Sequence, residues 1–139
     1  MLKKALIALF LACVSYAADA SSEAARHYQQ GLSYERLSRI NEAYTELQLA
    51  ANLDPNDAKI QLALGLVASR AGNLDVAQRA LEQSIALTGN SVASYHQLAL
   101  IYEKKGDKAR ALESWQRFLQ LNQDPSLREI AEKHIRYLE

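Results

Sequence analysis

Histidines, a cysteine and closely spaced carboxylates are the side chains here that could do chemistry. The three histidines, His27, His96 and His134, are far apart, and none has a second histidine at the i+4 spacing that brings two metal ligands together on a helix. The only cysteine is Cys13, so the chain has neither a disulfide framework nor a set of thiol ligands. We therefore expect no metal site and no cofactor.

The motifs of common catalytic and nucleotide-binding sites are also missing. Five scattered glycines form neither GxxxxGK nor GxGxxG, and the sequence contains no HExxH and no nucleophile elbow. The segment 54–58 does not match an EF-hand loop, and we interpret Asp54 and Asp57 as helix caps in a turn. We expect no catalytic residue and predict that the protein is not an enzyme.

The composition indicates which kind of secondary structure the chain forms. The chain of 139 residues suits one compact domain, and its 49% of hydrophobic residues can form a core. Alanine, leucine, glutamine and charged residues dominate while β-branched residues are sparse, which favours helices over strands. The formal net charge is zero. A nucleic-acid partner is therefore not expected, because such binders are strongly basic.

The first twenty residues have the pattern of an export signal. Two lysines at positions 3 and 4 precede the ten-residue apolar stretch 5–14, which is too short to cross a bilayer as a stable helix. The tripeptide Ala18-Asp19-Ala20 has the small-x-small form of a cleavage site. We predict that residues 1–20 are a signal peptide and that the mature chain begins near Ser21.

Three alternatives for this segment stay open. Cleavage could follow Ala17 instead of Ala20. The run Phe10-Leu11-Ala12-Cys13 resembles the lipobox of bacterial lipoproteins, although that motif prefers leucine where Phe10 stands. The segment could also be an apolar helix of the fold. We expect a periplasmic protein, with an outer-membrane lipoprotein as the alternative, so a membrane is a partner only if Cys13 is lipidated.

Beyond this leader the sequence repeats with a period of 34 residues. The columns that align are Gly31, Gly65 and Ala99; Leu32, Leu66 and Leu100; Ala43, Ala77 and Ala111; Leu47, Leu81 and Trp115; and Leu53, Leu87 and Leu121. Ser38, Gly72 and Gly106 share a further column, in which each residue would let the chain turn between two helices. Ser38 lacks the conformational freedom of glycine, so its turn is predicted to be strained.

This pattern resembles the tetratricopeptide repeat family. The first unit, 24–57, carries the family's signature columns at Gly31, Tyr34, Ala43, Leu47, Ala50 and Pro55. The second, 58–91, keeps Leu64, Gly65, Ala77 and Leu81 but departs at Ala68 and Gly89. The third, 92–125, keeps Leu98, Ala99, Tyr102, Ala111 and Trp115 but departs at Phe118 and Pro125. The resemblance implies an all-α fold, a right-handed α-solenoid of three helix-turn-helix units.

The last segment, 126–139, does not repeat the pattern. An apolar stripe at helical spacing consists of Leu127, Ile130, Ala131, His134, Ile135 and Leu138. The other face is polar. We predict a C-terminal capping helix, which covers the open end of the last repeat with one face and meets water with the other.

The resemblance also implies a place for a partner, because repeat stacks bind mostly on the concave surface that the first helix of each unit lines. The predicted partner-binding residues are Tyr28, Leu32, Arg36, Leu62, Leu66, Arg70, His96, Leu100 and Lys104. The leucines would form an apolar floor for an amphipathic helix or an extended peptide. The cations at its edge would meet acidic side chains of the partner.

Both features have simpler explanations that remain open. The cations end helices, where a positive charge favourably meets the helix dipole. The leucines could instead pack between repeats or be covered by the last helix. One subclass of the family holds a carboxylate in a clamp of lysine and asparagine, but Tyr28, Leu32 and Ala63 occupy the clamp columns here. Chaperone tails are therefore not expected as ligands.

Two functions follow as hypotheses. The first is an exported scaffold or adaptor that binds a segment of another protein and assists the assembly of a cell-envelope complex, such as a pilus, a secretion system or a cytochrome maturation machine. The second is a structural protein of the envelope that associates with itself, so that its partner is a second copy in a homo-oligomer.

Overall fold

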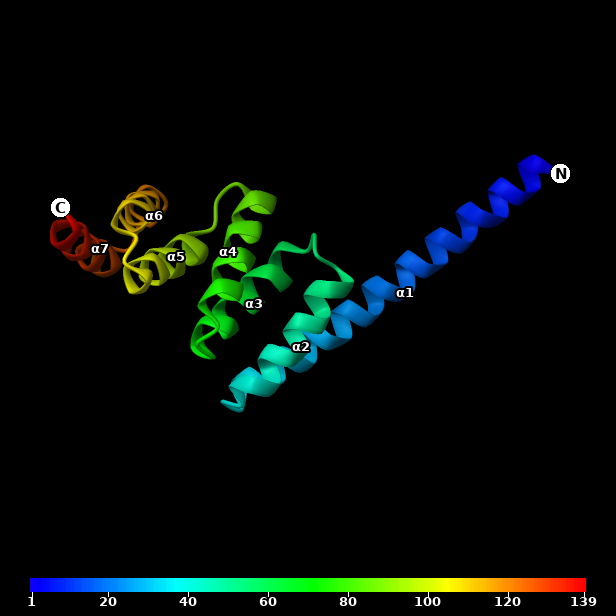
Figure 1. Ribbon diagram of the computed structural model, residues 1–139, viewed down its shortest axis with the longest axis horizontal. Helices are drawn as coiled ribbons and strands as arrows, with labels where there is room; N and C mark the ends of the chain where they lie inside the picture. Colours follow the sequence, from blue (N-terminus) through cyan, green and yellow to red (C-terminus); the bar gives the residue numbers. More distant parts are fainter. The chain divides into compact units, whose positions relative to one another are not determined.

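The computed structural model describes all 139 residues, which fold into seven helices without a strand (Figure 1). The helices are α1 (Leu2–Arg36), α2 (Ile40–Leu53), α3 (Ala58–Arg70), α4 (Leu74–Thr88), α5 (Val92–Lys105), α6 (Lys108–Leu121) and α7 (Pro125–Leu138). The predicted all-α fold is confirmed. The chain divides into two compact units, Met1–Pro55 with α1 and α2, and Asn56–Glu139 with the other five helices.

Short polar side chains begin four helices of the second unit. One carboxylate oxygen of Asp57 accepts hydrogen bonds from two backbone N–H groups of α3, at 2.8 and 3.2 Å. The capping role predicted for Asp57 is therefore confirmed. Ser91, Asp107 and Asp124 begin α5, α6 and α7 in the same way. Each such cap typically contributes about 1 kcal/mol to helix stability.

The turns inside the three hairpins share one backbone conformation. Ser38, Gly72 and Gly106 have φ angles of 59°, 83° and 76°, in the left-handed region that glycine adopts without strain. Ser38 is the one residue other than glycine with a positive φ. The strain predicted for this turn is thus present in the structure.

Small residues let the two helices of a hairpin approach closely. A Cβ atom added to Gly31 would lie 2.6 Å from the Cγ of Leu47, and one added to Gly65 would lie 2.6 Å from the Cγ of Leu81. Both leucines are fully buried. The glycines are needed for this packing, because a methyl group would overlap the leucine of the facing helix.

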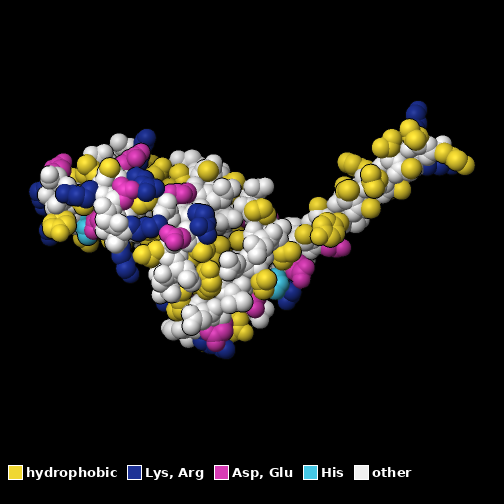
Figure 2. Space-filling view, in the orientation of Figure 1, with side chains coloured by type: hydrophobic (Ala, Val, Ile, Leu, Met, Phe, Trp, Pro, Cys, Tyr) yellow, Lys and Arg dark blue, Asp and Glu magenta, His cyan; other side chains and the backbone are white.

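In the first unit α1 is much longer than its hairpin requires. Residues 1–19 are exposed, and Figure 2 shows this part of α1 as a projecting helix covered largely by hydrophobic side chains. Its most apolar window of 18 residues has a mean hydropathy of 1.6 and is not buried. The whole helix is therefore long and apolar enough to cross a membrane, unlike the ten-residue stretch alone. A signal sequence near the N-terminus meets the same criterion.

In the second unit the two hairpins pack together and α7 packs against α6. Ala131 and Leu138 of α7 are buried, while its polar face with Arg136 is exposed. Leu127 and Ile130, which belong to the predicted apolar stripe, stay 40% and 45% exposed. The terminal helix therefore covers the third hairpin with only part of its apolar surface.

Candidate partner-binding site

The first helices of the second and third hairpins, α3 and α5, contact each other in the second unit. Leu62 and Leu66 on α3 and Leu100 on α5 are all half-buried, so each keeps part of its side chain at the surface. Lys104 follows Leu100 by about one helical turn and lies on the same face of α5. Together with Arg70 on α3 and His96 on α5, six of the nine predicted contact residues thus lie on two neighbouring helices.

A cavity of about 700 Å³ opens where α5, the start of α6 and α7 meet. We call it the inner cavity. Its apolar lining comes from Leu100, Tyr137 and Leu138, and its charged residues are the cations Lys104 and Lys108 and one carboxylate, Glu103, which contacts Trp115 and His134. Neither lysine has an ion-pair partner, although both line a concave surface. The terminal helix therefore forms one wall beside Leu100 and leaves the cavity open.

The three predicted edge cations all lie in the last turn of a helix. Arg36 ends α1, Arg70 ends α3, and Lys104 lies one residue before the end of α5. There a positive charge stabilises the helix by about 0.3–1 kcal/mol. All three are exposed, and Arg36 donates a hydrogen bond to the Oγ of Ser33 at 3.2 Å. Only Lys104 also lines the inner cavity.

The remaining predicted residues of the first unit lie on α1. Tyr28 and Leu32 are half-buried. Beside them the Nδ1 of His27 lies 2.6 Å from a carboxylate oxygen of Glu46, which joins α1 to α2. This histidine therefore has a structural partner on the facing helix.

His96 differs from the other predicted contact residues because its ring packs inward. The ring centroid lies 5.5 Å from that of Trp115 and 5.3 Å from that of Phe118. Burial, and to a lesser extent the nearby His134, hold the pKa of His96 below the usual value of 6.5. A partner would meet only the part of this ring that stays exposed.

The residues that tie α7 to α5 were not predicted from the sequence. Glu103 accepts a hydrogen bond from the indole Nε1 of Trp115 at 2.5 Å, and it lies 2.9 Å from the Nδ1 of His134. The His134 ring stacks on Trp115 with the centroids 4.6 Å apart. A buried indole N–H needs an acceptor, so Trp115 was the one residue in the sequence that indicated a hydrogen-bond partner here. The contact of His134 could not be predicted, because α7 lies outside the repeat and has no register to copy.

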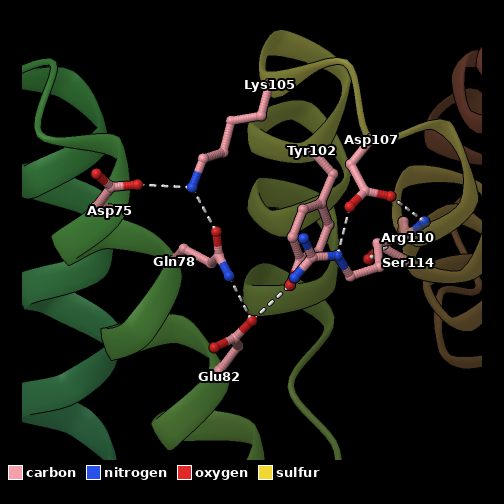
Figure 3. A network of polar contacts seen from close by, with 8 residues as sticks. All are labelled: Asp75, Gln78, Glu82, Tyr102, Lys105, Asp107, Arg110 and Ser114. Atoms are coloured by element: carbon pink, nitrogen blue, oxygen red, sulfur yellow. Dashed lines mark hydrogen bonds and ion pairs between the residues drawn. The ribbon is translucent and has the colours of Figure 1, made fainter.

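A chain of polar contacts joins α4 to α5 (Figure 3). The Nζ of Lys105 lies 2.7 Å from carboxylate Oδ1 of Asp75 and 2.7 Å from amide Oε1 of Gln78, and this contact lowers the pKa of Asp75. Oε1 of Glu82 accepts hydrogen bonds from Gln78 at 2.9 Å and from the hydroxyl of Tyr102 at 2.5 Å. Burial first, and then Glu82, raise the pKa of Tyr102 to about 12, so its hydroxyl stays a donor at neutral pH.

Comparisons with known proteins agree with this architecture. Two family models described as tetratricopeptide repeat match residues 24–57 and 92–125. No protein of curated function matches the chain.

Several solved structures share its fold at low sequence identity. The TPR domain of Arabidopsis OM64 has a TM-score of 0.76 at 13% identity, and the match covers 86% of this chain and 97% of that domain. The first TPR of Spaghetti (RPAP3), bound to an HSP90 peptide, gives 0.73 at 17%, covering 85% and 91%. The Yersinia enterocolitica type III secretion chaperone SycD, in complex with a peptide of the translocator YopD, gives 0.71 at 16%, covering 81% and 89%. Such identities show the fold alone.

Proposed function

Because the chain belongs to the tetratricopeptide repeat family, whose fold is a protein-interaction scaffold, we propose that it is an exported adaptor for a segment of a partner protein. The single observation that carries this proposal is the inner cavity. It combines apolar side chains on α5 and α7 with two lysines, Lys104 and Lys108, that have no partner of their own. The segment that suits it has a large apolar side chain beside acidic residues.

The binding energy of one apolar side chain in the inner cavity indicates how much more of the protein surface must contact the partner segment. Burying one leucine or phenylalanine side chain is worth about 1.5–3 kcal/mol. Micromolar affinity requires about 8 kcal/mol in total. One anchor in the inner cavity is therefore too little, and we propose that the segment continues along α3, where Leu62 and Leu66 are half-buried.

Export is part of the proposal. Residues 1–19 are exposed and the first buried residue of α1 is Ala24, so removal of residues 1–20 would leave the hairpin core intact. The predicted export signal supports a periplasmic location, and a scaffold there would have envelope proteins as its neighbours. We propose that the adaptor assists the assembly of a cell-envelope complex.

A pull-down with charged variants tests this function. Leu66→Glu and Leu100→Glu place a carboxylate on the surface that should bury an apolar side chain, so capture of the native partner should be lost while the helical circular dichroism spectrum is retained. Leu87→Glu is the matched control, because Leu87 is an exposed leucine on α4. Equal capture by all three variants would refute binding at the inner cavity.

Self-association is the alternative, and one observation favours it. Tyr137 and Ile130 of α7 are 82% and 45% exposed, an apolar surface that a second copy could cover. The mass of the full chain in solution at micromolar concentration distinguishes the two functions. A dimer that Tyr137→Glu dissociates supports self-association, whereas a monomer disfavours it.

A further inference from the structure

A second and smaller cavity of about 200 Å³ lies where α4, α5 and α6 meet. We call it the outer cavity. Tyr95, Leu98 and Tyr102 of α5 and Ile85 of α4 line it. On α5, Leu98 and Tyr102 face away from Leu100, because residues two apart on a helix of 3.6 residues per turn point in nearly opposite directions. With roughly 30 Å³ for each water molecule, the volume equals about seven waters and suits one long side chain.

The charges at the outer cavity are mostly negative. Glu82 and Glu113 line it, and Glu113 has no partner. Both hydrogen bonds that Glu82 accepts go to Oε1, so its Oε2 has none. The cation of the cavity is Arg110, whose Nε already lies 2.6 Å from Oδ2 of Asp107. Two carboxylates at the outer cavity therefore keep capacity for another cation.

The outer cavity also has the aromatic surface that cations favour. The guanidinium carbon of Arg110 lies 4.6 Å from the centroid of the Tyr102 ring, within the range of a cation–π contact (Figure 3). One tyrosine of the cavity thus already binds a guanidinium from this chain. Tyr95, which is half-buried on the same helix, provides a second ring.

We propose that the outer cavity is a second binding site, which takes an arginine or lysine side chain from a basic segment of a partner protein. The apolar stem of such a side chain would pack on Ile85 and Leu98, and its charged head would lie between Oε2 of Glu82 and the carboxylate of Glu113. This site goes beyond the proposed adaptor function. It favours the opposite charge and lies on the opposite face of α5, so the second unit could bridge a basic and an acidic segment.

The test uses the peptide acetyl-Gly-Arg-Gly-amide as the probe and ¹⁵N-labelled full chain in a non-ionic detergent. Saturable amide shifts are expected at Ile85, Tyr95 and Glu113. The same peptide with citrulline, a neutral residue of almost the same shape as arginine, should cause none. Equal shifts with both peptides would overturn the proposal. So would the absence of a saturable shift up to about 10 mM arginine peptide, because even weak binding with a millimolar Kd would be detected at that concentration.

Two variants with the same change of net charge distinguish binding at the outer cavity from a general electrostatic attraction between the peptide and the protein. Glu113→Gln should raise the Kd for the arginine peptide at least about threefold, which corresponds to the modest energy of an exposed ion pair. Glu132→Gln, on the polar face of α7, should leave it unchanged. An equal effect of both variants, or a dimer that Glu113→Gln dissociates, contradicts the proposal. Leu100→Glu should still bind the arginine peptide at the outer cavity. The proposal for the inner cavity and the proposal for the outer cavity can therefore fail independently.

Discussion

Ser38 turns the first hairpin with a φ of 59°, a conformation that costs a residue with a side chain roughly 1–2 kcal/mol. Ser38→Gly should remove this strain, although glycine also raises the entropy of the unfolded chain. We expect the free energy of unfolding in urea to rise by about 0.5 kcal/mol. Gly72→Ser at the equivalent turn should lower the free energy of unfolding by about 1 kcal/mol. A loss of stability in Ser38→Gly would contradict the strain assigned to Ser38.

Gly65 permits the closest approach inside the second hairpin. Gly65→Ala places a Cβ atom against Leu81, and such overpacking costs typically about 1–3 kcal/mol, more than the roughly 1 kcal/mol that alanine gains in helix propensity. We expect a net loss in chemical denaturation. In a Leu81→Ala background the same change should be neutral or stabilising. Additive losses in the double variant would show that the two side chains do not interact.

His96 should make stability depend on pH. Its pKa is lowered in the folded state, mainly by burial, so the unfolded chain takes up the proton first as the pH falls through 6.5. Its contribution to stability is complete above pH 6.5 and decreases below it. The melting temperature should therefore fall between pH 7 and pH 5, and His96→Gln should reduce that fall. His134 on α7 and Glu103 on α5 face the same cluster. An unchanged slope in His96→Gln would contradict the role assigned to His96.

Among the helices, α7 covers the third hairpin with two buried side chains, the small Ala131 and the larger Leu138. Ala131→Asp places a carboxylate where Ala131 is fully buried, and an unpaired buried charge is strongly unfavourable. We expect α7 to leave α6, so that the emission of the only tryptophan, Trp115, moves to longer wavelength as water reaches it. Glu132→Ala is the control on the exposed face of α7. An unchanged spectrum in Ala131→Asp would show that α7 does not cover Trp115.

The hairpins could be predicted from the sequence because their determinants recur every 34 residues. Column alignment places the turn at Ser38, Gly72 and Gly106, and it puts Gly65 in a column of small residues and Leu81 in a column of large ones. The structure adds that these two residues face each other. The contacts of α7 could not be predicted, because this helix lies outside the repeat and has no register to copy. The wall that it forms beside Leu100 comes from tertiary packing, which no local pattern encodes.

For the second unit, the proposed adaptor function depends most on the different charges of the two cavities beside α5. Lys104 and Lys108 outnumber Glu103 at the inner cavity, whereas Glu82 and Glu113 outnumber Arg110 at the outer cavity. The sequence predicts apolar and basic residues at Leu100 and Lys104, and the structure adds the cavity that contains them. It also adds the outer cavity with Glu82 and Glu113, which alignment of the repeat does not reveal. Residues from three helices line each cavity, so only the folded second unit brings them together.

Site-specific photocrosslinking in native cells tests whether a segment of a partner protein lies in the inner cavity. A benzoylphenylalanine residue at position 100 lies in the inner cavity, and the same residue at position 132 lies on the polar face of α7. We predict that position 100 crosslinks to one segment of another protein that combines acidic and large apolar residues, and that position 132 does not. Crosslinks from position 100 only to a second copy of this chain, or equal products from both positions, would contradict the claim.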